Sequence, residues 1–250
     1  MIKKTLILLQ VLILSTGCET FVENTSPTIT SVNDEDINDP SNIPFLINGV
    51  LNQYSHAHGY IGLWVDGLSD ELVFDGKVQG ATSNRGEKID NGIFEPTMGT
   101  TVNPYEAIAG AWRLAHILKE KLDDMDGEQD VEMEGYYTAY LYQGLPCFLL
   151  GSYYGKGPNY PDDGGATLDG SPFISSADLY DMALDYFNSA LNYADDYQAR
   201  VVHSLIARVL LYGGNFADAA VHASQGLQNG DPPFEALCGE EVGWVNMYWN

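Results

Sequence analysis

The residues best suited to ligand binding gather in one turn-rich stretch, residues 153–165, where Tyr153, Tyr154 and Tyr160 stand among glycines and prolines. Flat rings on a loop can stack against the faces of sugars or peptides, because a ring offers contact to CH groups without requiring charge. The same rings could instead fill the space between layers of helices, and the sequence supports both interpretations equally. The glycines do not form a dinucleotide-binding fingerprint, because Tyr160 stands where its last glycine would be.

Arg85 is a further candidate for ligand contact. It lies in residues 75–103, a long stretch of Gly, Thr, Asn and mixed charge that predicts a loop. A loop of this length in a compact domain is usually functional or disordered. On that ground alone the loop is a candidate for ligand contact, with Arg85 as one of its few cations.

Two patterns resemble metal sites without completing one. His56-Ala57-His58 is a pair that some metal sites use, but no third ligand follows at a suitable spacing, so a surface turn is the preferred interpretation. Residues 34–39 resemble a calcium loop, but they lack its sixth-position glycine, and Phe45 stands where the bidentate Glu belongs. We therefore expect neither a metal nor a cofactor.

Charge and motif content favour binding over catalysis. The formal net charge is −24 at pH 7, which disfavours nucleic acid as a partner, because phosphate contacts need clustered Lys and Arg. No G-x-S-x-G, H-E-x-x-H, P-loop or ordered Ser/His/Asp arrangement is present. Acidic residues are abundant enough for a glycoside hydrolase, but no spacing singles out a pair of carboxylates.

The first 17 residues have the pattern of an export signal. Lys3 and Lys4 form a short basic region, residues 5–14 form an apolar run too short to span a bilayer, and small residues lead into Cys18. This order is similar to the signal of bacterial lipoproteins, with Ser15 where Leu or Val is more usual. We expect residues 1–17 to be removed and Cys18 to carry acyl chains such as palmitate.

The mature chain is expected to begin with a spacer. Residues 18–42 are rich in Thr, Ser, Asn, Asp and Pro without apolar periodicity, which predicts a flexible tether before a folded domain at residues 43–250. Cys147 and Cys238 could form a disulfide in an exported protein, and they could equally be two buried free thiols.

Helical periodicity of the apolar residues predicts the elements of the folded domain. One helix is opened by Pro44 and another starts at Tyr60. A third starts at Asn103-Pro104, and a fourth covers residues 131–151 with a kink or break at Pro146. A fifth covers residues 176–193 with Ser176 as its cap.

Residues 199–227 predict two helices folded back on each other. Their apolar pattern is interrupted by Gly213-Gly214 and resumes at Phe216. The order of small and aromatic residues approximates a tetratricopeptide repeat, a unit that buries its apolar face by stacking on neighbours. We therefore predict an all-α fold of tetratricopeptide-like helical hairpins stacked in a solenoid-like scaffold with long loops.

Several of these signals, taken in order, resemble one family. Cys18 is followed by the polar tether, by the early helix Pro44-Phe45-Leu46-Ile47-Asn48-Gly49 and by a tyrosine-rich helix ending in Gly151-Ser152-Tyr153-Tyr154-Gly155. Residues 199–223 then read ARVVHSLIARVLLYGGNFADAAVHA. Together they resemble the SusD/RagB outer-membrane nutrient-binding lipoproteins. Members of that family are usually far longer, so the chain resembles an N-terminal half or a truncated member.

The resemblance implies a mostly helical protein at the cell surface, lipid-anchored in the outer membrane, that captures glycans or peptides without catalysis. It also implies delivery of the ligand to a SusC-like TonB-dependent porin. The family binds ligands through an arc of aromatic residues, partly from a downstream half that this sequence lacks, so no site residue maps individually. The alternatives are a glycoside hydrolase using paired carboxylates and a helical-repeat adaptor that binds only protein.

Overall fold

The computed structural model describes residues 36–69, 71, 83–93, 99–124, 129–154 and 164–236. The chain divides into two compact units, Met1–Asp39 and Pro40–Asn250. In the first unit, the described residues form the short 3₁₀ helix η1 (Asp36–Asn38). All the other described elements belong to the second unit.

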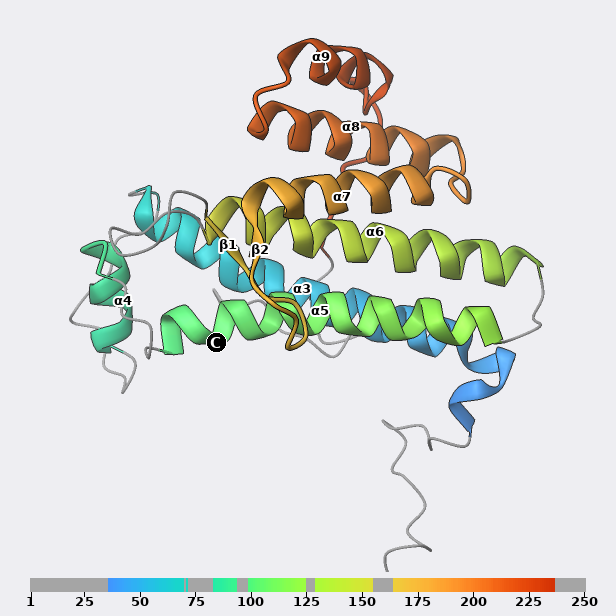
Figure 1. Ribbon diagram of the computed structural model, residues 1–250, viewed down its shortest axis with the longest axis horizontal. Helices are drawn as coiled ribbons and strands as arrows, with labels where there is room; N and C mark the ends of the chain where they lie inside the picture. The colour runs from blue at the N-terminus through green and yellow to red at the C-terminus, as the bar shows by residue number, and fades with distance from the viewer. Residues whose placement is uncertain are drawn as a thin grey trace, which may run out of the picture. The chain divides into compact units, whose positions relative to one another are not determined.

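The second unit is almost entirely helical in the residues described (Figure 1). This confirms the predicted all-α class, and none of these helices has the length and apolar character needed to cross a membrane. The elements in chain order are η2 (Pro40–Asn42), α3 (Ile43–Leu68), α4 (Ser83–Asp90), α5 (Gly99–Asp124), α6 (Gln129–Tyr153), β1 (Gly165–Ala166), β2 (Ile174–Ser175), α7 (Ser176–Ala190), α8 (Asp196–Tyr212) and α9 (Phe216–Gln225).

Helix α6 is the centre of the packing. It contacts α3 and α5 on one side and α7 on the other, and α8 and α9 continue the stack beyond α7 (Figure 1). Every residue from Leu141 to Leu150 is buried. A Cβ at Gly144 would meet the Phe187 ring at 2.5 Å, so α6 and α7 approach closely because this position has no side chain.

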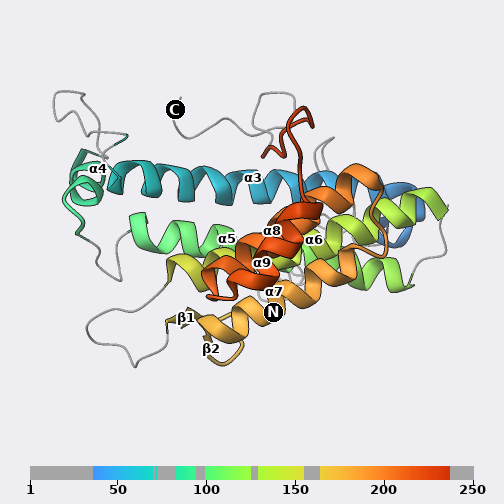
Figure 2. The same ribbon diagram turned by 90° about the horizontal axis from the view of Figure 1, so that it is seen from above.

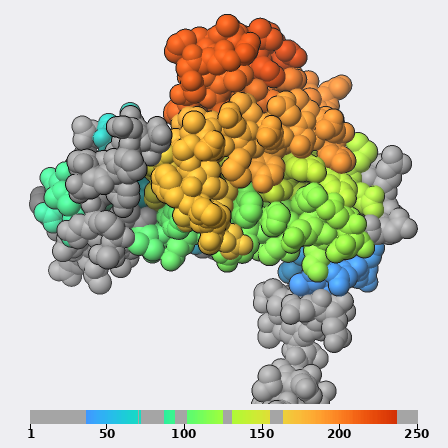
Figure 3. All heavy atoms as spheres, viewed as in Figure 1, coloured from blue at the N-terminus to red at the C-terminus, as the bar shows by residue number. Residues whose placement is uncertain are grey.

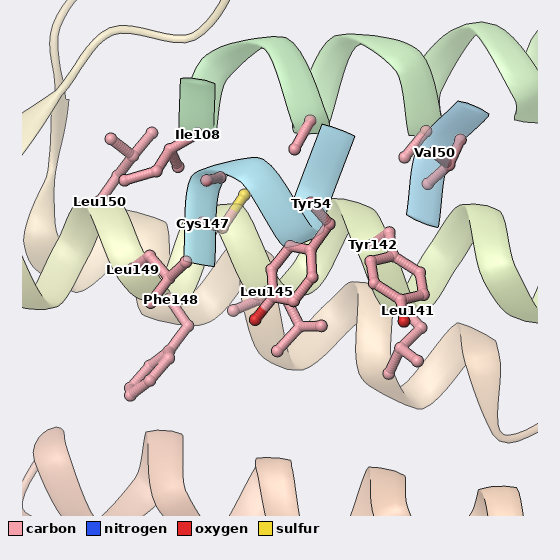
Figure 4. Close-up of a cluster of buried hydrophobic side chains, with 14 of the residues drawn as sticks. Val50, Tyr54, Ile108, Leu141, Tyr142, Leu145, Cys147, Phe148, Leu149 and Leu150 are labelled. Atoms are coloured by element: carbon pink, nitrogen blue, oxygen red, sulfur yellow. The ribbon is translucent and has the colours of Figure 1, made fainter. Parts of the chain in front are cut away.

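The main core lies where α3, α5 and α6 meet (Figure 4). The Tyr54 and Tyr142 rings contact edge to face, with centroids 5.0 Å apart. The Cys147 thiol is free and buried in the same core, and burial raises its pKa to about 12. Cys238, the other cysteine considered for pairing, lies outside the described residues.

The structure corrects the predicted boundaries of the first helices. Helix α3 runs unbroken from Ile43 to Leu68, so the surface turn expected at His56-Ala57-His58 is wrong. Tyr54, Ala57, Ile61 and Trp64 are all buried at helical spacing, so one apolar stripe continues through this segment and leaves no place for a turn. Within residues 75–103, expected to be a loop, the chain forms α4 and the first turn of α5.

The structure also corrects two predicted helix starts and the break predicted at Pro146. Helix α5 starts at Gly99, so Pro104 lies inside it instead of opening it. Helix α6 continues through Pro146, so of the predicted kink or break the break is wrong; every residue around Pro146 is buried, and its neighbours hold the helix together. The cap of α7 is Ser175 instead of Ser176, since the Ser175 hydroxyl accepts a hydrogen bond from the Asp178 N–H at 3.1 Å.

The predicted helical hairpin is present as α8 and α9, joined at Gly213-Gly214 (Figure 1). Gly214 has a φ of +82°, a conformation that glycine adopts without strain. A capping box of Asp195 and Gln198 starts α8, and the Asn215 side chain caps α9. The imidazoles of His203 and His222 meet between the two helices, with their Nδ1 atoms 3.0 Å apart.

Candidate ligand-binding site

Tyr153 and Tyr154, two of the predicted ligand contacts, lie at the C-terminal end of α6. Tyr153 is the last residue of the helix and Tyr154 follows it, and both are half-buried. Successive long helices run antiparallel, so this end of α6 lies near the C-terminal end of α3 and the N-terminal part of α5 (Figure 2). The site is therefore built at one end of the helical layers.

Tyr154 joins two rings from other helices in what we call the aromatic cluster, Trp64, Tyr105 and Tyr154. Its ring centroid lies 5.9 Å from that of Trp64 and 5.6 Å from that of Tyr105, the latter edge to face. Burial raises the pKa of Tyr154 well above its ordinary value, and the neighbouring Tyr105 hydroxyl raises it further. The cluster is thus a neutral, mostly apolar contact that packs the end of α6 against α3 and α5, with Trp64 buried in the core and the other two rings partly buried.

A short β-hairpin fastens the cluster from outside. The Gly165 N–H donates to the Tyr154 carbonyl at 2.8 Å, and the Tyr105 hydroxyl contacts the Thr167 carbonyl at 2.9 Å. Arg113 of α5 forms an ion pair with Asp169 at the hairpin tip. Residues 164–175 therefore cross α5 (Figures 1 and 3), as the ribbon and the space-filling view both show.

The hairpin also presents an exposed ring. Phe173 is 54% exposed and lies across the hairpin from Gly165. A Cβ at Gly165 would lie 2.0 Å from the Ile174 carbonyl oxygen, so the two strands can approach only with glycine at this position. Phe173 thus places a solvent-accessible ring beside the backbone segment that binds Tyr154.

Tyr153 is directed to different neighbours. Burial raises its pKa, the hydroxyl of Tyr212 raises it further, and the guanidinium of Arg208 opposes the shift. Both neighbours belong to α8, whereas the neighbours of Tyr154 belong to α3 and α5. The two consecutive tyrosines therefore lie at two distinct contact regions of the same helix end.

The structure describes less of the remaining predicted site residues. Arg85 belongs to α4, whose Ile89 packs against α3 at Gly67. Tyr160 and Cys18 lie outside the described residues. Of the predicted ligand contacts, Tyr153 and Tyr154 are therefore the ones whose side-chain surroundings the structure describes.

Sequence reasoning missed Tyr105, Thr167, Phe173 and Arg208 as members of this region. Tyr105 follows Pro104 in a pattern that indicated only the start of a helix. Its hydroxyl contacts Thr167, which is 62 positions away in the chain. Local periodicity carries no information about such a contact, and no other signal in one sequence reveals it.

The described residues contain no group of three His, Cys, Asp or Glu side chains that could hold a metal ion. His56 and His58 are two positions apart on α3, a spacing that directs them to different sides of a helix. Burial lowers the pKa of both imidazoles, and the charge of Arg208 lowers that of His58 further. The two imidazoles thus do not converge on one point.

Comparison with known proteins places the fold. No family model and no curated protein sequence matches this chain. The crystal structure of a SusD-like carbohydrate binding protein from Bacteroides vulgatus ATCC 8482 is similar, with a TM-score of 0.58, 16% sequence identity and coverage of 81% of this chain and 47% of that chain. The chain therefore has a SusD-like fold and spans about half the length of that protein.

Proposed function

We propose that this protein is a non-catalytic lipoprotein that binds glycans at the cell surface and delivers them to a TonB-dependent porin of the outer membrane. The observation that carries the proposal is the fold shared with a SusD-like carbohydrate binding protein over 81% of the chain. The exposed Phe173 ring beside the aromatic cluster supports glycan as the ligand, because ring faces contact the CH faces of sugars without requiring charge. Peptide is the alternative ligand.

The N-terminal pattern supports the anchoring part of the proposal. A basic start, an apolar run and small residues before Cys18 are the elements of a lipoprotein signal. Acyl chains on Cys18 would hold the protein at the membrane without a spanning helix. Incorporation of labelled palmitate into the full-length protein, abolished by Cys18→Ser, would support this part, and unchanged incorporation would contradict it.

Glycan binding is tested with the full chain and one matched pair of variants. Phe173→Ala removes the exposed ring at the hairpin, whereas Phe216→Ala removes a ring of the same type that is 67% exposed on α9. Retention on immobilised polysaccharides should fall with Phe173→Ala and persist with Phe216→Ala. Equal retention of both variants would argue against the hairpin end as the site.

The same samples separate the other functions. A glycoside hydrolase would shorten the polysaccharide, and its turnover would stop on substitution of one Asp or Glu. An adaptor that binds only protein would not be retained on any of the immobilised polysaccharides. Recovery of a large outer-membrane porin with the tagged lipoprotein would support delivery, and repeated absence of that porin would contradict it.

A further inference from the structure

Arg208 of α8 differs from the other cations of the helical layers in what it contacts. Arg113, Lys119 and Arg200 each pair with a carboxylate, of Asp169, Asp123 and Asp231 respectively. Arg208 has no carboxylate within ion-pair distance and no hydrogen-bond acceptor among the described residues. Instead, its Cζ lies over the Phe148 ring, 5.3 Å from the centroid.

The charge of Arg208 acts on three helices. It lowers the pKa of His58 beyond the effect of burial, and it opposes the rise that burial causes in the pKa of Tyr54. It acts in the same direction on Tyr153 at the end of α6. The guanidinium itself lies over Phe148, at the contact of α8 with α6, and no described neighbour neutralises its positive charge.

One buried and one exposed aromatic ring lie near the guanidinium of Arg208. Phe148 is buried at 3% exposure, and the guanidinium lies over the face of its ring. Tyr212 contacts Phe148 edge to face, with centroids 5.3 Å apart, and is 51% exposed. The guanidinium of Arg208 and the solvent-accessible ring of Tyr212 thus both contact Phe148.

We propose that Arg208 and Tyr212 form a subsite for the carboxylate-bearing sugar of an acidic oligosaccharide, a uronic acid residue. This inference rests on the proposed glycan-binding function and specifies the class of glycan. A planar guanidinium binds a carboxylate through two parallel N–H donors, while the exposed ring covers the CH face of the pyranose. A neutral sugar would leave the donors of Arg208 without this partner.

The overall charge makes an unpaired arginine significant. The chain carries 35 acidic and 11 basic residues, so its long-range field repels anions. An anionic ligand can bind such a surface only where a local cation is not already paired with a carboxylate of the protein. Among the residues that the structure describes, no carboxylate pairs with Arg208, and contact with the Phe148 ring leaves its N–H donors available.

The test is calorimetric titration of the full chain with trigalacturonic acid and with its fully methyl-esterified, uncharged form. We expect the acid to bind more tightly than the ester. Arg208→Gln should weaken binding of the acid by about tenfold or more, the usual size of a charge-assisted hydrogen bond, and leave binding of the ester unchanged. Arg208→Lys should retain part of the difference.

Controls separate a binding role from a structural one. Arg200→Gln removes an arginine of the same helix that is paired with Asp231, and it should leave both affinities unchanged. Tyr212→Ala should weaken the acid and the ester alike, because the ring contacts the part that they share. Melting temperatures of the variants within a few degrees of the parent protein would show that they remain folded.

The outcomes also distinguish this inference from the function on which it rests. Equal affinity for acid and ester, or an unchanged preference in Arg208→Gln, would overturn the acidic subsite and leave glycan binding standing. Failure of a broad panel of glycans to bind would overturn both. Arg208-dependent binding of an acidic tripeptide, without binding of the uronate, would also overturn the subsite by assigning the cation to peptide carboxylates.

Discussion

The Tyr105 hydroxyl lies 2.6 Å from the Oγ1 atom of Thr167 and 2.9 Å from its carbonyl oxygen. One side chain of α5 therefore holds the β-hairpin that fastens the end of α6. Because Tyr105 also contacts the Tyr154 ring, the same residue links the hairpin to the aromatic cluster.

Tyr105→Phe should lower the free energy of unfolding by about 1 kcal/mol, the usual net contribution of a partly buried hydrogen bond. Urea denaturation of the full chain measures the change. Tyr60→Phe is the matched control, because the described residues offer the Tyr60 hydroxyl no hydrogen-bond partner. Equal destabilisation by the two substitutions would mean that the bond to Thr167 is not the cause.

Gly144→Ala should destabilise the protein by about 1–3 kcal/mol or more, because the added methyl group would press into the Phe187 ring and separate α6 from α7. Gly49→Ala is the matched control on α3, where a Cβ meets nothing within 4 Å. That substitution should stabilise the helix by about 0.5–1 kcal/mol. Opposite shifts of the urea midpoint are the expected result, and shifts of the same sign would contradict the described helix contacts.

Acidification should weaken the contact between α8 and α9. Burial lowers the pKa of His203 from its ordinary 6.5, and the neighbouring His222 lowers it further. The folded state therefore takes up this proton less readily than the unfolded chain. The stability is fully present above pH 6.5 and declines as the pH falls from 6.5 towards the folded-state pKa.

Thermal melts at pH 8 and pH 5 measure this effect. His222→Gln should reduce the loss of stability between the two values, because it removes the like charge that faces His203. His58 and His56 also have lowered pKa values and contribute to the loss in both proteins. The prediction therefore concerns how much more stability the parent loses between pH 8 and pH 5 than the variant does. An identical loss in both proteins would refute it.

Cys147 should be inert towards alkylating reagents while the protein is folded. Its side chain is fully buried in the core, and burial raises the pKa of the thiol to about 12, so almost no thiolate is present at neutral pH. Iodoacetamide labelling followed by peptide mass spectrometry should detect modified Cys147 only after urea unfolding. Rapid labelling in buffer would show that α6 is not the packed centre of the layers.

The sequence was most informative where one local signal decides the structure. The hairpin of α8 and α9 was predicted correctly, because Gly213-Gly214 interrupts a single apolar stripe and the following turn needs a glycine at Gly214. Composition and periodicity also gave the all-α class correctly. In such segments the information lies within a few residues, where pattern analysis can find it.

Prediction failed where local and tertiary signals competed. The His56-Ala57-His58 pair without a third metal ligand was interpreted as a surface turn, yet Ala57 and Ile61 belong to a buried stripe that runs through that segment. Asn103-Pro104 resembled a helix start, although α5 begins at Gly99. The partners of Arg208 and Tyr105 come from other helices, so their grouping depends on packing that no single stretch of sequence encodes.

The central claim is that this chain binds glycan and leaves it chemically unchanged. The most direct measurement is a calorimetric titration of the full chain with a panel of neutral and acidic oligosaccharides. The ligand is then recovered from the calorimeter's sample cell and its length is determined by chromatography. The account predicts saturable binding of at least one oligosaccharide. After the titration, that oligosaccharide should still have its original length. Absence of binding across the panel, or recovery of shortened fragments, would contradict it.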